Sequence, residues 1–509
     1  MSEGAAIAGD AASATAVEAK VSARLMALFL LLGFSAGLPF FMFSTVLAVR
    51  LTDHGVALAV VGFFAWVQLL PTFKFLWAPA LDRYSVPGFG RFWGRRRGWI
   101  MLAQAGIAMS LVAMALTSED ESLPLTALLA ICLAFWTTTL EIAADAWRIE
   151  LAPTQEAQAP LAAANLWGYR SAMVAAGSGA LILADHGGWT AAYLLIAAAA
   201  LVPLPILAAL EPEAPGTRGR MAALGSGLAA TIVILLAVTA AFALIGWLLL
   251  GTAEGMGIDS KSNVTPWVLG VAMLPFVAMA AALPRIRRAG PNSRLRTSPA
   301  IGPYVDFFWR YGAAAIALMA FVSVYRMGDV LALNMSKPMI LGLGYNKTEI
   351  GLADSYIALI ASIAGVGIGA WITARWPFAA TLAIGAVFAG IGNFGFVWLA
   401  HQPHDQVLLY AATAADQFGN GMAGAIFVVY LSLLVNPRYA GAQYAFLSGF
   451  AFLLSRLLSG AGGTVIERLD AQGLAGFDLF FLASGAISLA AVVFLPWVAN
   501  PHSREEEGA

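Results

Sequence analysis

The stretch FKFLWAPALDRYSVPGFGRFWGRRRGW, residues 73–99, contains both features that decide the fold. Lys74 lies in a run apolar enough to enter a membrane, and the chain then breaks into a loop that holds Asp82 and a cluster of arginines up to Arg97. Short loops rich in Lys and Arg remain on the cytoplasmic side of a membrane, so this loop is predicted to face the cytoplasm. An ionisable side chain within a span is costly, and function is its default explanation.

The composition predicts an all-α polytopic membrane protein. Of the 509 residues, 60% are hydrophobic and 11% are charged, whereas soluble domains have about 25% charged residues. The net charge of -1 gives no basic excess to neutralise phosphates, so no nucleic-acid partner is expected. The single cysteine, Cys132, can form no internal disulfide. His401 and His404 flank a proline without a third ligand nearby, so neither a metal nor a cofactor is expected.

The sequence predicts about fourteen transmembrane helices, each long enough to cross about 30 Å of hydrocarbon. They are expected at 25–49, 58–81, 98–117, 123–145, 160–184, 188–210, 225–251, 265–284, 311–339, 348–374, 378–400, 406–435, 438–465 and 475–498. The predicted divisions are a disordered cytoplasmic tail at 1–23, a six-helix half at 24–210, a linker with an inserted helix pair at 211–310, a second six-helix half at 311–498 and a tail at 499–509.

The distribution of Lys and Arg predicts the orientation. An even number of spans puts both termini on one side, and that side has nineteen of the 28 Lys and Arg residues, whereas the other has five. Both termini are therefore expected in the cytoplasm. The remaining four, Lys74, Arg170, Arg326 and Arg456, lie within spans.

The chain also contains an internal repeat. GYRSAMVAAGSGALILAD at 168–185 is echoed by FLLSRLLSGAGGTVIERL at 452–469, and each has an Arg shortly before a glycine cluster. Two six-helix halves related in this way resemble the major facilitator transporters, whose halves rock around a site at mid-membrane. The predicted helix pair between the halves is expected to be peripheral to transport.

Several local motifs resemble the AmpG muropeptide permeases. They are GFSAGLP at 33–39, KFLWAPALDRY at 74–84, GRRRGW at 94–99, DAWR at 145–148, GYR at 168–170, RMGD at 326–329 and QYAFLSG at 443–449. The resemblance implies proton-driven import of anhydromuropeptides, which are cell-wall fragments made of an aminosugar pair bearing a short peptide, across the bacterial inner membrane. The implied partners are this substrate, protons and lipids, and the chain is expected to be a monomer.

Some positions depart from that family. The family commonly has Lys where this chain has Arg148 and Arg326, and a Glu-Asn pair where this chain has Asp416 and Gln417. The sign of each charge is retained, but arginine presents a planar fork where lysine is a point charge.

The rise of about 1.5 Å per helical residue predicts which polar side chains lie deep in the membrane. Guanidinium groups bind carboxylates with two hydrogen bonds, so arginines in the spans suit the peptide of a muropeptide, while amides and hydroxyls suit its sugars. The alternative is that these arginines pair structurally with acids across the bundle. The predicted substrate-binding residues are Lys74, Asn165, Tyr169, Arg170, Arg326, Gln417, Asn420 and Arg456.

Asp329 is the predicted proton carrier. It lies three residues after Arg326, so the two can touch on one helical face, and the carboxylate must then choose between the arginine and a proton. Asp416 and Asp354 are competing candidates.

A gate is predicted at the cytoplasmic ends of the spans, with a fixed structural clasp as the alternative. Glu141, Asp145 and Arg148 recur at helical spacing there. The predicted gating residues are Asp82, Arg83, Arg95, Glu141, Asp145 and Arg148.

Three other functions remain open from the sequence. A carrier of another bulky anion, such as an acyl-coenzyme A or a siderophore-like or drug-like compound, would use the same central charges. A membrane enzyme, such as a lipid-linked sugar transferase, would need large loops at a membrane face, and the loops here are short. A receptor or scaffold would not require so many charges at mid-depth.

Overall fold

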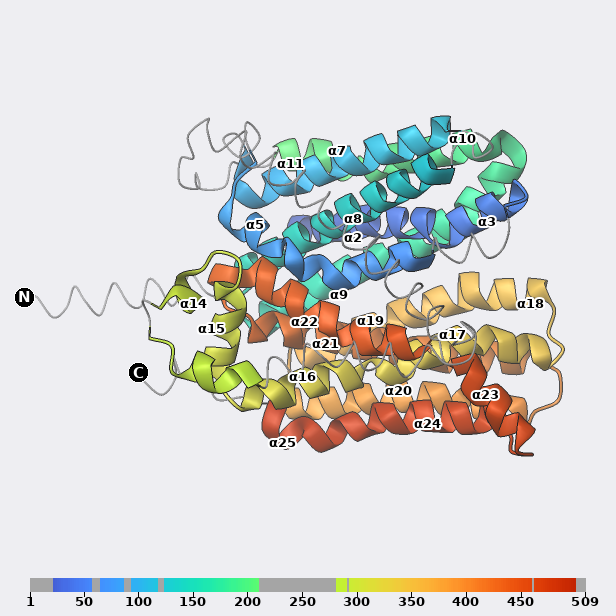
Figure 1. Cartoon of the computed structure of the whole chain (residues 1–509). Helices are drawn as coiled ribbons and strands as arrows, with labels where there is room; N and C mark the ends of the chain where they lie inside the picture. The colour runs from blue at the N-terminus through green and yellow to red at the C-terminus, as the bar shows by residue number, and fades with distance from the viewer. Residues whose placement is uncertain are drawn as a thin grey trace, which may run out of the picture.

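Two groups of helices, one from each half of the chain, lie side by side in the structure (Figure 1). The computed structural model describes residues 22–56, 65–86, 93–117, 123–209, 281–290, 293–459 and 462–499. Within these ranges the regular structure is helical and contains no strand. The chain is therefore an all-α polytopic membrane protein, as its composition predicts.

In the first half, long apolar helical stretches cover five of the six predicted spans, whereas the predicted span at 58–81 is described only from residue 65, as η1 and α5. The fifth and sixth predicted spans run on without a loop through α9, η2 and α10, and Gly188, with φ 79° and ψ 163°, breaks α10. A positive φ of this kind favours glycine, and the break coincides with the predicted boundary between these spans. The elements are α2 (Ala23–Phe43), α3 (Thr45–Asp53), η1 (Ala65–Leu76), α5 (Ala78–Arg83), α7 (Arg95–Leu116), α8 (Leu123–Leu151), α9 (Gln155–Val174), η2 (Ala175–Gly179), α10 (Ala180–Ala200) and α11 (Pro203–Ala209).

The second half begins with two short helices before its first span. Gly312, with φ 55°, ends the second of them, so the membrane helix begins at Ala314 and not at the predicted residue 311. The elements are α14 (Arg294–Thr297), α15 (Gly302–Tyr311), α16 (Ala314–Tyr325), α17 (Met327–Gly342), α18 (Lys347–Leu352), η3 (Ala353–Ile357), α19 (Ala358–Thr373), α20 (Phe378–Ala400), α21 (Gln406–Leu434), η4 (Pro437–Tyr439), α22 (Ala440–Ser459), α23 (Gly462–Ala471), α24 (Gly476–Ala490), η5 (Ala491–Phe494) and α25 (Leu495–Val498).

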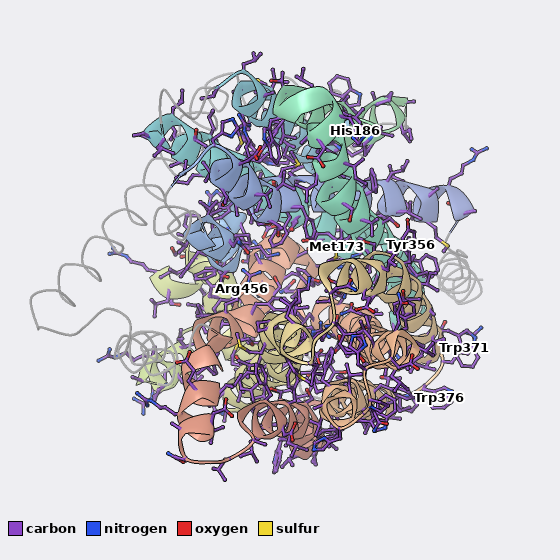
Figure 2. All side chains as sticks on the ribbon, turned by 90° about the vertical axis from the view of Figure 1, so that its right-hand side faces the viewer. Met173, His186, Tyr356, Trp371, Trp376 and Arg456 are labelled. Atoms are coloured by element: carbon purple, nitrogen blue, oxygen red, sulfur yellow. The ribbon has the colours of Figure 1, made fainter. Side chains whose placement is uncertain are left out.

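Nine helical stretches within the described ranges are long and apolar enough to cross a membrane. The predicted spans at 225–251 and, up to residue 280, at 265–284 lie outside the described residues, as do nearly all of both predicted tails. The outer surface suits lipid, because Trp371 and Trp376 are 53% and 45% exposed on the outside of the second half (Figure 2).

Glycines let the helices around the centre approach closely. A Cβ atom at Gly168 of α9 would lie 1.8 Å from the Leu30 carbonyl oxygen of α2. On α21, a Cβ atom at Gly419 would lie 2.3 Å from the Phe388 oxygen of α20, and one at Gly421 would lie 2.5 Å from the Ser362 oxygen of α19. Small residues permit such contacts between membrane helices. These contacts fix the backbones that hold the polar side chains described below.

The bundle has two ends, which we name by their short helices. The α5 end holds α5, α11, α14, α15 and α25, and the α18 end holds α3, α18 and α23 (Figure 1). An apolar cluster of α9, α19 and α21 joins the halves, and it includes Ala159, Ala163, Val366 and Val429. Ala159 and Ala163 lie near the start of α9, so the cluster seals the halves toward the α5 end.

Candidate functional site

Two arginines from opposite halves meet near the middle of the bundle on one amide. Arg170 of α9 donates from Nη2 to Asn420 Oδ1 at 2.6 Å, and Arg326 donates from Nη2 to the same oxygen at 3.2 Å. Arg326 also donates from Nη1 to the Asn420 carbonyl oxygen at 3.2 Å. This central cluster bridges the halves through charge-assisted hydrogen bonds, which are stronger than neutral ones.

Arg326 owes its position to a break between two helices. α16 ends at Tyr325 and α17 begins at Met327, so the predicted single helix is interrupted at the arginine. Asp329 lies in the first turn of α17, where the helix dipole favours a carboxylate. Its Oδ2 is 2.8 Å from Arg326 Nη1, so the predicted ion pair is present, and both side chains are at most 8% exposed.

Asp416 belongs to the central cluster through its electrostatic interactions. Its Oδ2 accepts from Gln417 Nε2 at 2.9 Å, and it interacts electrostatically with Asp329, Arg170 and Arg326. Two cations and two acids are thus grouped together at mid-depth. Because the four charges cancel, the cluster can exchange a proton or an anionic ligand without leaving a large uncompensated charge buried.

A second charged cluster lies between the first half and α22. Lys74 Nζ is 3.4 Å from Glu141 Oε2, and Arg456 donates from Nη1 to the Gln68 carbonyl oxygen at 2.9 Å and to Thr72 Oγ1 at 2.8 Å. Tyr169 interacts electrostatically with Glu141, Arg456 and Arg170, so it lies between the two clusters. Figure 2, which looks onto the α18 end, shows Arg456 at the boundary between the halves.

The other predicted polar contact of the substrate site, Asn165, is held by the packing of α2 on α9. Its backbone carbonyl would be 1.9 Å from a Cβ atom at Gly33. Its side chain is partly exposed and lies one helical turn from Tyr169, on the helix that carries Arg170.

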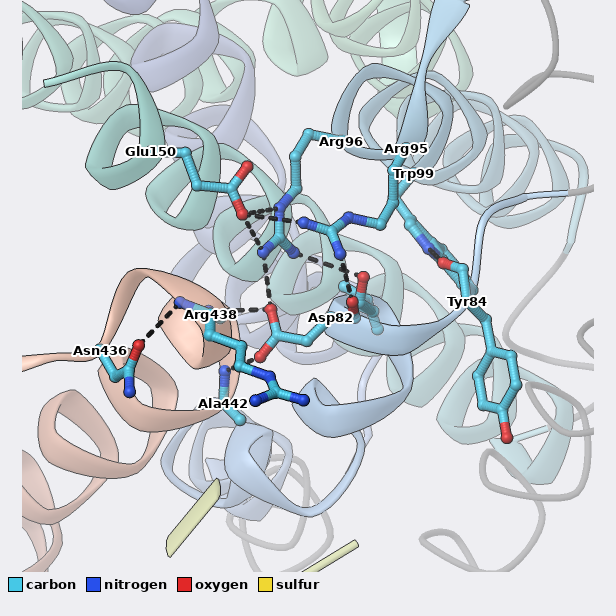
Figure 3. Close-up of polar contacts among 11 residues, drawn as sticks. Asp82, Tyr84, Arg95, Arg96, Trp99, Glu150, Asn436, Arg438 and Ala442 are labelled. Carbon is cyan, nitrogen blue, oxygen red and sulfur yellow. Dashed lines mark hydrogen bonds and ion pairs between the residues drawn. The ribbon is translucent and has the colours of Figure 1, made fainter. Parts of the chain in front are cut away.

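A third cluster closes the α5 end (Figure 3). The Asp82 carboxylate accepts from the backbone N–H groups of Gly441 at 3.0 Å and Ala442 at 2.7 Å, at the start of α22. The same carboxylate pairs with Arg96 at 2.7 Å, and Arg96 pairs with Glu150 at 2.6 Å. Helix N-termini bind anions through such free N–H groups, so an acid of the first half here holds a helix of the second.

The remaining predicted gating residues divide into two groups. Arg95 donates to the Asp82 carbonyl oxygen and pairs with Glu150 at 2.9 Å, so it belongs to the closing cluster. Arg83 is exposed and lies over the Tyr84 ring, 5.9 Å from its centroid. Glu141 lies with Lys74 in the second cluster.

Arg148 makes a separate connection across the halves at the α5 end. It donates to Gln158 Oε1 at 2.6 Å and to Ser432 Oγ of α21 at 3.1 Å, and it pairs with Asp145 at 3.1 Å. Gln155 donates from Nε2 to the carbonyl oxygens of Thr373 and Trp376 in the second half.

A contact from α15 adds to this closure. The Tyr304 hydroxyl donates to the Phe75 carbonyl oxygen of η1. Burial raises the pKa of Tyr304, so the hydroxyl keeps the proton that it donates. The sequence did not reveal five of the closing residues, because uncharged residues and residues next to loops give no signal of depth. They are Glu150, Gln155, Gln158, Tyr304 and Ser432.

The α18 end is joined differently. Ser178 and Ser355 lie 3.3 Å apart, Oγ to Oγ, and this hydrogen bond connects the halves there. Both serines lie in π-helical turns, η2 and η3. Asp354 of η3 pairs with Lys337 at 2.5 Å, and both side chains are over 40% exposed. Asp354 is therefore remote from the central cluster.

No group of three or more metal-ligating side chains occurs in the part of the chain that the structure describes. His401 is 3.3 Å from Asp478, and His404 is 3.6 Å from Glu349. Each histidine contacts a separate acid, so the two do not form one site.

The two helical halves have the fold of a transporter superfamily. The family model of the Major Facilitator Superfamily matches residues 29–459, and the chain belongs to this superfamily. It is a transporter and not an enzyme.

Relatives with named functions cover nearly the whole chain. A transporter named AmpG 4 from Rickettsia conorii is 28% identical over 93% of this chain and 96% of its own length. The anhydromuropeptide permease of Escherichia coli strain K12 is 27% identical over 91% of this chain and 78% of its own length.

Solved structures support the fold. The proton:xylose symporter XylE bound to 6-bromo-6-deoxy-D-glucose has a TM-score of 0.59 and 16% identity, covering 94% of this chain and 95% of that one. The human organic anion transporter MFSD10 has a TM-score of 0.52 and 16% identity, covering 92% of this chain and 98% of that one.

Proposed function

We propose that this transporter imports anhydromuropeptides from the periplasm to the cytoplasm of a bacterium and couples their entry to protons. The observation that carries the proposal is the convergence of Arg170 and Arg326, one from each half, beside Asp329 and Asp416. The similarity to a named anhydromuropeptide permease supports this choice of substrate.

The substrate's chemistry matches the two inner clusters. Arg170 and Arg326 bind a peptide carboxylate through their guanidinium forks. Lys74 and Arg456, in the second cluster, bind a further anionic or carbonyl group. Asn165, Tyr169 and Gln417 donate to and accept from the sugar hydroxyls, because amides and phenols offer both kinds of hydrogen bond.

Asp329 is the proposed proton carrier. In the present arrangement its Oδ2 lies 2.8 Å from Arg326 Nη1, and this pairing favours the carboxylate form. A substrate carboxylate draws the guanidinium away, and the buried acid then takes a proton from the periplasmic side. After the halves rock, the substrate leaves, Arg326 returns and the proton departs to the cytoplasm. Linkage requires that substrate and proton each favour the binding of the other.

The proposed orientation puts the α5 end and both termini in the cytoplasm. Arg95, Arg96, Arg294, Arg296 and Arg310 lie in elements at this end, as expected for cytoplasmic segments. Arg83→Cys at the α5 end and Thr52→Cys at the other end test it, because both positions are exposed. In right-side-out vesicles an impermeant maleimide should label the cysteine at 52 alone. Labelling at 83 alone would show that the orientation is the reverse of the one proposed.

The deciding experiment uses purified protein in liposomes with a labelled anhydromuropeptide. Asp329→Asn should abolish accumulation driven by a pH gradient and leave exchange of preloaded substrate measurable. Asp53→Asn is the matched control, since Asp53 accepts from Trp189 within the first half, away from the central cluster. Accumulation by Asp329→Asn would move the coupling to Asp416 or, next, Asp354. Absence of any uptake or exchange by the unaltered protein would refute the choice of substrate.

A further inference from the structure

The Asn420 side chain occupies the point on which the two central arginines converge. Its Oδ1 accepts from Arg170 at 2.6 Å and from Arg326 at 3.2 Å. A guanidinium carries donors alone, so the amide oxygen and not its NH2 group must face both arginines. One acceptor held by two cations from opposite halves marks the position that a carboxylate oxygen of a ligand would take.

We infer that Asn420 is a positioning residue whose amide oxygen stands in for the substrate carboxylate, holding the two arginines together and competing with substrate for them. The inference rests on the proposed function, because it takes the ligand of Arg170 and Arg326 to be a peptide carboxylate. It gives Asn420 a role different from hydrogen bonding to the sugars.

The backbone around Asn420 is built to hold it there. Gly419 and Gly421 on either side pack directly against the backbones of α20 and α19, where a Cβ atom would lie within 2.5 Å of a carbonyl oxygen. Asn420 itself is 9% exposed. Because α21 cannot shift at this turn without moving both neighbours, the amide is presented to the arginines at a fixed place.

The contacts of Arg326 show which bond can be exchanged. Its Nη1 holds the Asn420 backbone oxygen at 3.2 Å, whereas its Nη2 holds the side-chain oxygen. On Arg170, the Nη1 atom lies 4.0 Å from the Met173 sulfur, which is a weak contact. The Asn420 side chain can therefore rotate away, and a ligand oxygen can replace it on both Nη2 atoms and draw Arg326 from Asp329.

Competition predicts opposite effects for two substitutions. Asn420→Ala removes the internal acceptor, so binding of a carboxylate ligand should tighten by about three- to tenfold, because the binding-competent fraction rises. Asn420→Asp supplies a full carboxylate to both arginines, so binding should weaken by tenfold or more, since a charged acceptor is held more strongly than a neutral one.

The test measures equilibrium binding to the purified full-length protein with two synthetic probes. One is an anhydromuropeptide with a tripeptide, and the other is the same molecule with its peptide carboxylates converted to amides. Both substitutions should change the affinity for the first probe and leave the second within twofold. Gln406→Ala is the matched control, because that amide lies at the start of the same helix and donates to the Tyr410 hydroxyl, and it should leave the affinity for both probes within twofold.

A result of equal weakening for both probes in Asn420→Ala would overturn the inference and assign Asn420 to the sugars or to packing. A measurement without ligand separates this from failure of the proposed function. Asn420→Asp should raise the midpoint of thermal unfolding, and the increase should vanish when Arg170→Gln is added. If the unaltered protein binds neither probe but Arg170→Gln removes the increase in the unfolding midpoint, the proposed substrate is wrong and the Asn420 bridge between the arginines is supported. If Arg170→Gln does not remove the increase, the proposed bridge is wrong.

Discussion

Asp82→Asn should open the α5 end of the transporter. The Asp82 side chain is 5% exposed, and its carboxylate accepts hydrogen bonds from the N–H groups of Gly441 and Ala442. It also pairs with Arg96, whose side chain is 1% exposed. The two bonds to Gly441 and Ala442 join the first half to the second only while this end is closed. Removing the charge therefore destabilises the closed state and leaves the open state, where water solvates the side chain, nearly unchanged.

The size of the effect follows from the kinds of bond lost. Hydrogen bonds to a charged group contribute about 1.5–3 kcal/mol each, and neutral ones about 1 kcal/mol. The asparagine has one oxygen, so it retains one neutral bond to the start of α22 where the carboxylate made two charge-assisted ones. The difference is about 2–5 kcal/mol, and its lower end is roughly a 30-fold shift toward the open state because 1.4 kcal/mol is tenfold.

Cysteine labelling measures this shift. Ala146 of α8 is fully buried among residues of the second half, so Ala146→Cys, in a protein with Cys132→Ser, reacts with a maleimide only when the α5 end opens. The labelling rate should rise roughly 30-fold or more in Asp82→Asn, since it follows the open population. Asp53→Asn, the same change at the other end, should leave it unaltered. An unchanged rate in Asp82→Asn would refute a closing role and leave the cluster as a fixed clasp within the first half.

Three further results are expected. Arg170→Lys should weaken binding of an anhydromuropeptide by about tenfold through loss of the guanidinium fork, and the loss should disappear for a probe whose peptide carboxylates are amides; equal losses in binding measurements would indicate a structural arginine. Gly168→Val should destabilise the protein by about 1–3 kcal/mol through overpacking against α2, whereas Gly351→Ala, with no atom near its Cβ position, should be neutral in thermal unfolding. Ser178→Cys with Ser355→Cys, in a background without the native cysteine, should form a disulfide that stops transport until it is reduced; full activity of the oxidised protein would show that this contact need not open.

The helical architecture and several central side chains are predictable from the sequence, because hydropathy and charge both depend on depth in a membrane. Arg326 and Asp329 pair as their spacing predicts, even though the expected single helix is broken between α16 and α17. The i, i+3 contact survives because it requires only the first turn of α17. Helix breaks without proline or a positive φ leave no mark in composition, so the break itself was not predictable.

The partner that each charged side chain selects could not be predicted. Glu141 and Asp145 are four residues apart on one helix, yet Glu141 pairs with Lys74 and Asp145 with Arg148. Helical spacing tells which side chains share a face, but the rotation of that face toward η1 or α21 is set by tertiary packing. The binding of Asp82 to backbone N–H groups was hidden for the same reason, since every helix begins with free N–H groups and the sequence does not say which acid meets them.

The distribution of contacts between the halves explains how a substrate could drive the cycle. At the α5 end the halves are tied by buried ionic and backbone bonds from Asp82 and Arg148, whereas at the α18 end the described residues contribute the Ser178–Ser355 bond. The ties at the α5 end must break for release on that side, and only a ligand that binds the reoriented state better can offset their loss. A carboxylate between Arg170 and Arg326 fits this requirement, because it replaces a neutral amide bridge with an ionic one at the pivot. In the proposed cycle the substrate then holds the halves together at the centre while the α5 end separates, and a stronger central bridge lowers the free-energy cost of opening.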